Sequence, residues 1–263
     1  MSAPPAQADI LLSVRDVSVA FGGIVALNGI SFDQRKGQIL GLIGPNGAGK
    51  TTLFNCLSRL YQPTGGDILM EGASILKRAP HQICAMGIGR TFQNVALFSQ
   101  LSVADNIRIG AHARARGDIV SDALRLPWTR RREARLNAKV DDILDYLDLR
   151  GCAAQQVKGL PFGTQKRVEL GRALAARPKI LLLDEPAGGL NHEEVHGLGT
   201  LIMRIRDERA ITILLVEHHM GLVMSIADHV VALNFGRKLA EGTPAEVQSD
   251  PLVIKAYLGA KDQ

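Results

Sequence analysis

The sequence predicts an α/β protein with a mostly parallel sheet at its core and a helical segment inserted into the chain. Two observations lead to this prediction. Short apolar runs, typical of strands buried on both faces, alternate with helical patterns in both the first and the last part of the chain. Between residues 88 and 156 these runs give way to helical periodicity and polar loops. That segment is therefore expected to be the insertion.

The first part of the chain contains three predicted strands and one helix. Leu11 to Phe21 is rich in Leu and Val, residues 38–43 form a short apolar run that ends at a glycine, and residues 68–70 follow a Gly-Gly turn. Lys50 to Leu60 is expected to be helical because its apolar residues recur on one face. Strand, glycine-rich loop and helix thus follow one another.

The later part repeats this alternation. Lys179 to Leu183, Thr212 to Val216 and Val230 to Leu233 are continuous apolar runs that predict parallel strands. Helices are predicted around residues 195–205 and 220–227. Another helix lies in the insertion and should end by Gly151; its apolar face is Leu136, Val140, Ile143, Leu144 and Leu147. We expect one domain over residues 1–263, with residues 1–87 and 157–263 as its core and 88–156 inserted.

Composition narrows the class of protein. Hydrophobic residues make up 46% and charged residues 22%, and 31 Lys and Arg against 26 Asp and Glu give a net charge of +5. This mild excess does not require a nucleic-acid partner. The three cysteines form no metal or disulfide pattern. No stretch approaches the roughly 20 apolar residues that span a bilayer, and residues 1–9 lack signal-peptide features. We therefore expect a soluble, cytoplasmic chain that reaches membranes only through partners.

A phosphate-loop motif follows the second predicted strand. Residues 44–51 fit the pattern G-x-x-x-x-G-K-[ST], in which glycines allow backbone amides to surround phosphate oxygens at the start of a helix. Lys50 is expected to reach the β- and γ-phosphates, and the Thr51 hydroxyl to bind Mg²⁺. The alternative is a glycine-rich turn with an incidental lysine, which the strand before and the helix after disfavour. The candidate ATP-binding residues here are Gly44, Asn46, Gly47, Ala48, Gly49, Lys50, Thr51 and Thr52.

Two adjacent carboxylates end the strand predicted at residues 179–183. Asp184 is expected to hold Mg²⁺, and Glu185 to act as the general base that activates water, a role typically worth roughly 10²–10⁴-fold in rate. Two carboxylates that merely cap a strand before Pro186 are the alternative. Together with the phosphate loop, the pair defines a phosphate-loop NTPase.

Further motifs specify the family. Arg90-Thr-Phe-Gln-Asn94, Leu160-Pro-Phe-Gly-Thr-Gln165, Gly188-Gly-Leu-Asn191 and Glu217-His218 surround the carboxylates in a fixed order. Over nearly the whole chain this ordered set resembles the nucleotide-binding subunits of ABC transporters. The resemblance implies a RecA-like core with a small N-terminal antiparallel β part. It also implies a dimer in which two subunits enclose each ATP.

The resemblance assigns roles to three more residues. Phe21 would stack on adenine, although it could also be an apolar residue that ends a strand. Gln93 would contact Mg²⁺ and the attacking water and link the site to the membrane subunit. His218 would contact the γ-phosphate, whereas His219 is expected to be a solvated residue at a helix start.

In this family the segment around Gly163 faces the ATP of the partner subunit. Phe162, Gly163 and Thr164 are therefore expected to bind ATP in trans. The chain departs from the family pattern here, because Pro161 replaces a serine that normally contacts the γ-phosphate and Thr164 replaces a common Gly or Gln. We expect active hydrolysis with an altered contact across the dimer.

Asn191, which replaces a common Asp, also has two readings. It would belong to a loop that crosses the dimer interface, and with Glu194 three residues later it fits a helix N-cap. Both interpretations can hold at once.

Within the family the chain resembles the ATPase subunits of branched-chain amino acid importers. The similarity lies in residues 21–28, residues 90–93, the insertion at 111–135 and residues 242–259. It implies integral membrane permease subunits, a second ATPase subunit of the same or a related kind, and indirectly an extracytoplasmic solute-binding protein. The chain would then lie on the cytoplasmic face of the inner membrane. The same subfamily serves urea, amides and other small solutes, so the substrate stays open.

The arginine-rich insertion and three rival classes of protein bear on this interpretation. A solvated loop is favoured over a nucleic-acid or lipid patch for the insertion. A soluble ABC ATPase acting on DNA or ribosomes typically has coiled-coil arms or two cassettes, and this chain has room for neither. The long arginine-bearing insertion and the C-terminal ending argue against the ATPase of lipopolysaccharide export. A binding module without activity is disfavoured because the motif residues are present. The insertion contains Arg114, Arg116, Arg125, Arg130, Arg131, Arg132 and Arg135, with Trp128 among them.

Overall fold

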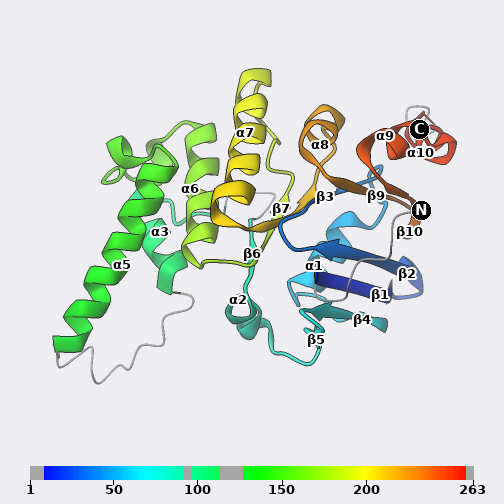
Figure 1. The fold of residues 1–263 in the computed structure, drawn as a ribbon, viewed down its shortest axis with the longest axis horizontal. Helices are drawn as coiled ribbons and strands as arrows, with labels where there is room; N and C mark the ends of the chain where they lie inside the picture. Colours follow the sequence, from blue (N-terminus) through cyan, green and yellow to red (C-terminus); the bar gives the residue numbers. More distant parts are fainter. Residues whose placement is uncertain (1–8, 92–95, 113–126, 259–263) are drawn as a thin grey trace.

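The computed structural model describes residues 9–91, 96–112 and 127–258. Two sheets lie at one end of the molecule and a group of helices at the other (Figure 1). The larger sheet has the strand order β10-β9-β3-β8-β7-β6. Its strands are β3 (Ile39–Ile43), β6 (Ile88–Arg90), β7 (Ile180–Asp184), β8 (Thr212–Val216), β9 (His229–Asn234) and β10 (Arg237–Gly242).

The central strands of this sheet are parallel, as the apolar runs predict. β3 pairs with β8 and β9, β8 pairs with β7, and β7 pairs with β6, all in parallel, whereas β10 is antiparallel to β9. Every residue of β3, β7 and β8 is buried. Because successive side chains point to opposite faces, each strand contributes to two cores: Ile39, Leu181 and Ile213 belong to one, Leu40, Leu182 and Leu214 to the other.

A four-stranded antiparallel sheet of order β2-β1-β4-β5 covers the second core. Its second strand did not stand out in the sequence, because buried Leu27, Ile30 and Phe32 alternate with exposed or half-buried residues and give no continuous apolar run. The strands are β1 (Ile10–Phe21), β2 (Ile24–Arg35), β4 (Gly65–Met70) and β5 (Ala73–Ser74).

Two predicted helices end earlier than expected. The first ends at Leu57 because Arg59 takes a left-handed φ of 59°, and Leu60 is left 58% exposed. The helix in the insertion ends at Tyr146, just before Asp148 with a φ of 55°. Among the described residues, the helices outside the helical group are α1 (Lys50–Leu57), α2 (Ile83–Met86), α7 (His192–Arg209), α8 (Met220–Ile226), α9 (Pro244–Ser249) and α10 (Pro251–Leu258). Short 3₁₀ turns lie at Pro80–Gln82, Arg150–Cys152 and Val157–Gly159.

The helical group differs from the predicted insertion at both of its boundaries. Ile88–Arg90, expected to begin the inserted helices, forms the edge strand β6. Conversely α6 (Phe162–Ala175), expected in the core, packs against α3 (Val103–His112) and α5 (Pro127–Tyr146). Gly110 allows this close packing, because a Cβ there would lie 1.9 Å from the Arg172 carbonyl oxygen.

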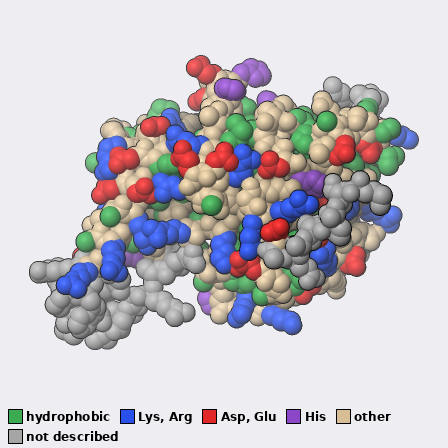
Figure 2. All heavy atoms as spheres, viewed as in Figure 1, with side chains coloured by type: hydrophobic (Ala, Val, Ile, Leu, Met, Phe, Trp, Pro, Cys, Tyr) green, Lys and Arg blue, Asp and Glu red, His purple; other side chains and the backbone are tan. Residues whose placement is uncertain are grey.

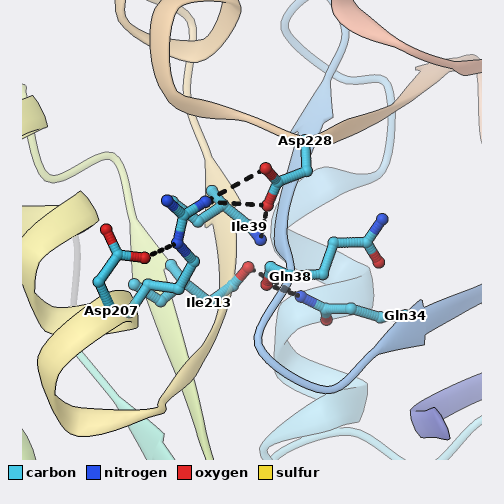
Figure 3. A network of polar contacts seen from close by, with 7 residues as sticks. Gln34, Gln38, Ile39, Asp207, Ile213 and Asp228 are labelled. Carbon is cyan, nitrogen blue, oxygen red and sulfur yellow. Dashed lines mark hydrogen bonds and ion pairs between the residues drawn. The ribbon is translucent and has the colours of Figure 1, made fainter.

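The amino edge of the large sheet is closed by side chains (Figure 3). Asp228 accepts a hydrogen bond from the Ile39 amide at 2.8 Å and pairs with Arg206. Gln34 donates to the Ile213 carbonyl at 2.8 Å. Side chains therefore satisfy the Ile39 amide and the Ile213 carbonyl at this edge, whereas the loops at the opposite, carboxyl edge carry the sequence motifs. Within the described part of the chain, no helix combines the length and apolar character needed to cross a membrane.

Candidate functional site at the carboxyl edge of the large sheet

The sequence motifs meet because parallel strands end at the same edge of a sheet. The phosphate loop follows β3, Asp184 ends β7, His218 follows β8, and Thr91 follows β6. In this kind of fold, ligands bind beyond the carboxyl ends of the strands. The topology therefore gathers residues that are up to 174 positions apart in the chain, from Gly44 to His218.

Three glycines shape the phosphate loop, with φ values of 152° at Gly44, 78° at Gly47 and 100° at Gly49. A Cβ at Gly49 would lie 2.8 Å from the Ala26 carbonyl oxygen, and one at Gly44 would lie 2.3 Å from that of Leu233. Other residues would be strained and would clash here. The left-handed positions are those that let backbone amides form an anion-binding concavity.

Lys50 begins α1 and lies inside this loop. Its side chain is buried, and its Nζ donates to the carbonyl oxygens of Gly44 at 2.7 Å and Pro45 at 3.0 Å. Burial lowers the pKa of Lys50, and the negative charges of Glu185 and Asp184 oppose that shift. The next residue, Thr51, is exposed at the mouth of the loop.

Asp184 forms a buried ion pair that the sequence did not predict. Its Oδ2 lies 2.8 Å from the guanidinium of Arg90, and the two side chains are only 4% and 10% exposed. Arg90 also donates to Asn55 of α1 and to Ser58, the residue that follows this helix, at 2.9 Å each. Burial raises the pKa of Asp184 and the Arg90 hydrogen bond opposes it. The sequence signal for Arg90 is its position at the end of a short apolar run, within the segment that the pattern predicts to be the helical insertion.

Glu185 and His218 lie close to one another. His218 Nδ1 is 3.8 Å from Glu185 Oε2, and their side chains are 60% and 21% exposed. Glu185 has a left-handed φ of 46°. His219 caps α8 by accepting a hydrogen bond from the Leu222 amide at 3.3 Å. It starts a helix as expected, although its side chain is half-buried rather than solvated.

Phe21 ends β1 and is 46% exposed. Its ring packs edge-to-face against Tyr61 with the centroids 5.2 Å apart. An exposed aromatic pair of this kind offers an apolar face to a planar ligand. Tyr61 was not predicted, since no motif marks it.

The segment expected to act in trans forms the first turn of α6. Pro161 is its N-cap and provides no side-chain cap. Phe162 is 45% exposed and lies against Gly189, where a Cβ would be 2.9 Å from the ring, and Thr164 is half-buried. In Figure 1, α6 and α1 lie on opposite sides of β6 and β7. One chain thus presents the phosphate loop and this segment at separate places.

Asn191 caps α7 as predicted. Its side chain accepts from the Glu194 amide at 2.9 Å, and the Glu194 carboxylate accepts from the Asn191 amide at 2.9 Å. A Cβ on Gly163 would lie 2.8 Å from that same carboxylate. The start of α7 therefore packs directly against the start of α6.

Two predicted features lie outside the described residues. These are Gln93 and most of the arginine-rich insertion, of which Arg131 and Arg135 are described and exposed. On the face drawn in Figure 2, acidic and basic side chains are interspersed over the described part.

The fold and the phosphate loop define the chain as a phosphate-loop nucleotide-binding protein. Its sequence matches the family described as "ABC transporter" over residues 27–188, and residues 237–263 match the family "Branched-chain amino acid ATP-binding cassette transporter". The chain belongs to the ABC transporter ATP-binding family and is a transport-coupled ATPase subunit of that class. Subunits of this class work with membrane permeases and dimerise.

Individual related proteins and solved structures agree with this family assignment. The chain is 42% identical over 249 residues to the high-affinity branched-chain amino acid transport ATP-binding protein BraF of Pseudomonas aeruginosa, covering 95% of this chain and 98% of BraF. It is 41% identical to LivG of Escherichia coli, a protein of the same description, with the same coverage. A nucleotide-free ATP-binding cassette from an ABC transporter superposes with a TM-score of 0.82 at 29% identity, covering 94% and 98% of the two chains. A structure described as the ADP conformation of an ATP-binding cassette of an ABC transporter gives a TM-score of 0.81 at 28% identity, covering 95% and 99% of the two chains.

Proposed function

We propose that this chain binds and hydrolyses MgATP to power the import of branched-chain amino acids or related small solutes. The observation that carries the proposal is the meeting of the phosphate loop, Asp184, Glu185 and His218 at one edge of the sheet. The names of the similar proteins BraF and LivG support the substrate class.

The bound nucleotide would extend from Phe21 to the phosphate loop. Phe21, backed by Tyr61, provides an aromatic face for the adenine. The amides of the loop and the start of α1 surround the phosphates, and the Lys50 ammonium exchanges its carbonyl partners for phosphate oxygens. The residues that take part are Gly44, Asn46, Gly47, Ala48, Gly49, Lys50, Thr51 and Thr52.

The residues around the phosphate loop fit a magnesium ion. Thr51 offers a hydroxyl and Asp184 a carboxylate, which are the hard oxygen donors that Mg²⁺ prefers. Gln93, which lies outside the described residues, would add an amide oxygen. The buried pairing of Asp184 with Arg90 shows that its carboxylate faces positive charge in the folded protein. When bound, the ion neutralises charge that develops on the phosphate oxygens.

Hydrolysis would take place at Glu185. Its carboxylate, partly exposed beside His218, accepts a proton from the attacking water, and the His218 imidazole donates to the γ-phosphate. A second ATPase subunit, identical or related, supplies Phe162, Gly163 and Thr164 to complete the site. The two subunits dock on membrane permease subunits at the cytoplasmic face of the inner membrane, and a solute-binding protein delivers the substrate from the other side. We propose no nucleic-acid partner.

Affinity purification of the tagged full-length chain from gently solubilised native membranes tests the proposal. We expect two polytopic permeases to co-purify, together with a second ATPase subunit where the dimer is heteromeric. Reconstitution of that assembly should couple ATP hydrolysis to uptake of leucine, isoleucine or valine. Recovery of soluble or nucleic-acid-associated proteins alone would contradict the importer.

A further inference from the structure

Glu217 is a fully buried carboxylate whose hydrogen bonds go to backbone amides of two different loops. Its Oε1 accepts from the Ala187 amide at 2.7 Å, and its Oε2 accepts from the amides of His218 and His219 at 3.1 Å each. Ala187 lies in the loop after β7 and the histidines lie after β8. A single side chain therefore connects the two loops that carry Glu185 and His218.

The first of these loops needs such an anchor. Glu185 is held at a φ of 46°, a conformation that non-glycine residues keep only where the surroundings fix it. Its own amide donates to the Val216 carbonyl at 2.9 Å, and Pro186 has no amide to donate. The next available amide is that of Ala187, which Glu217 binds. The strained residue is thus bracketed by two bonds to the end of β8.

The second loop is fixed by the other oxygen of the same carboxylate. Because Oε2 binds the amides of His218 and His219, it sets the turn from which the His218 side chain leaves the sheet. The His218 ring is 60% exposed, so packing contributes little to its position. The 3.8 Å separation of His218 Nδ1 from Glu185 Oε2 then depends on backbones that share one anchor.

We propose that Glu217 is a positioning residue that holds the general base Glu185 and the switch histidine His218 in register. The inference rests on the proposed function, because it assumes that these two residues act on ATP. The chemistry requires a carboxylate. A glutamine has one acceptor oxygen and one amide nitrogen, so in either orientation an NH₂ group faces a backbone N–H.

The test compares Glu217→Gln with a matched control, Asp228→Asn. Asp228 also accepts a hydrogen bond from a backbone amide, that of Ile39 at the start of β3, but it lies at the opposite edge of the sheet (Figure 3). In the full-length chain, or in the permease assembly if turnover requires it, we expect Glu217→Gln to lower kcat roughly 10- to 100-fold, since small misplacements of reacting groups have effects of that size. KM for ATP should change less than about threefold, because the phosphate loop is untouched. Asp228→Asn should leave kcat within about twofold of wild type.

A second variant covers the case in which Glu217→Gln folds poorly. Glu217→Asp keeps the charge and can still bind the two local histidine amides, but it is one methylene shorter and cannot also reach Ala187. Backbone hydrogen exchange followed by NMR should show faster exchange of the Ala187 amide, on the order of tenfold or more, with His218 and His219 nearly unchanged. kcat should fall while KM holds.

Non-additivity separates positioning from general destabilisation. If Glu217 acts through His218, Glu217→Gln should cost much less in kcat when introduced into His218→Ala than into wild type. Wild-type turnover in Glu217→Gln, or full additivity with both His218→Ala and Glu185→Gln, would overturn the inference and leave the proposed function intact. Wild-type turnover in Glu185→Gln would instead remove the proposed function, while the exchange of the Ala187 amide would still report on the anchor.

Discussion

At the scale of single residues, the buried charged side chains that the structure describes in the candidate site are each held by specific groups. Lys50 donates hydrogen bonds to two loop carbonyls, and Asp184 forms an ion pair with Arg90. Glu217 accepts hydrogen bonds from three backbone amides. Burying a charge without such partners would cost several kcal/mol. Glu185 and His218 differ from these three, because their side chains stay partly exposed. Their exposure allows these two side chains to meet a water molecule and a phosphate.

Glu185→Gln should separate ATP binding from hydrolysis. The amide cannot accept the proton of the attacking water, so we expect turnover to fall roughly 10²–10⁴-fold while ATP binding persists. Phosphate release and nucleotide titration on the purified chain measure the two quantities. Lys50→Ala, which removes a phosphate ligand, should instead abolish tight binding. Equal loss of binding in both variants would contradict the assigned roles.

Cys56 should be protected from alkylation in the folded protein. It is fully buried in α1, and burial raises the pKa of its thiol from 9.0 to about 11, a shift that Arg59 slightly opposes. At pH 8.5 we expect iodoacetamide to modify it at least roughly 100-fold more slowly than in urea. Peptide mass spectrometry can follow this.

The same shift affects folding stability. The folded thiol keeps its proton to higher pH than the unfolded one, so this group should lower stability as the pH rises from about 9 to about 11. Unfolding of wild type and Cys56→Ala in urea at pH 8 and pH 10 would reveal the difference. A Cys56 contribution that grows with pH would contradict the buried position.

At the scale of elements, the sequence predicted the parallel strands better than the boundaries of the helices. Continuous runs such as residues 212–216 could be recognised because both faces of the strand are buried. The β2 strand and the ends of α1 and α5 could not, since they depend on alternation and on left-handed residues such as Arg59 and Asp148. The strand β6, which ends at Arg90, was not predicted for a related reason, because its three residues are too few to show a hydrophobic period.

Two glycine variants should have opposite effects on helices. Gly110→Ala places a methyl group where α3 meets the backbone of α6, 1.9 Å from the Arg172 carbonyl, so we expect a loss of about 1–3 kcal/mol in the free energy of unfolding. Gly197→Ala lies in α7 with no atom within 4 Å of the new methyl and should gain about 0.5–1 kcal/mol. Denaturant titration measures both. A stabilised Gly110→Ala would show that α3 and α6 do not pack this closely.

At the scale of the whole molecule, the residues expected to act in trans and the phosphate loop belong to different parts of one chain. Their association could be predicted from the resemblance to a family but not from patterns within this sequence, because no single-chain pattern encodes a partner. The placement of Gln93 likewise remains a prediction. By contrast, the meeting of four residues at one edge of the sheet within a single chain follows directly from the strand topology. These residues are Lys50, Asp184, Glu185 and His218.

Pro161→Ser should strengthen ATP-driven dimerisation. A serine at the N-cap of α6 can bond the helix start and offer a hydroxyl to the partner's γ-phosphate, an interaction with a charged group that is worth on the order of tenfold in affinity. Size-exclusion chromatography of the Glu185→Gln background with ATP would report it, with Pro161→Ala as the control for removing the ring. No change in dimerisation in that background, together with no change in the turnover of Pro161→Ser in the otherwise wild-type chain, would contradict the altered contact.

The candidate site draws residues from both sheets, and this arrangement has a consequence for nucleotide specificity. Phe21 belongs to the antiparallel sheet, whereas the phosphate loop, the carboxylates and His218 belong to the mixed one. In the proposed function, the base and the triphosphate are therefore recognised by separate structural layers. Changes in the β1–β2 hairpin can alter discrimination among ATP, GTP and CTP while the rate constant for bond cleavage stays the same. Nucleotide specificity and the rate of hydrolysis can accordingly diverge independently among related chains.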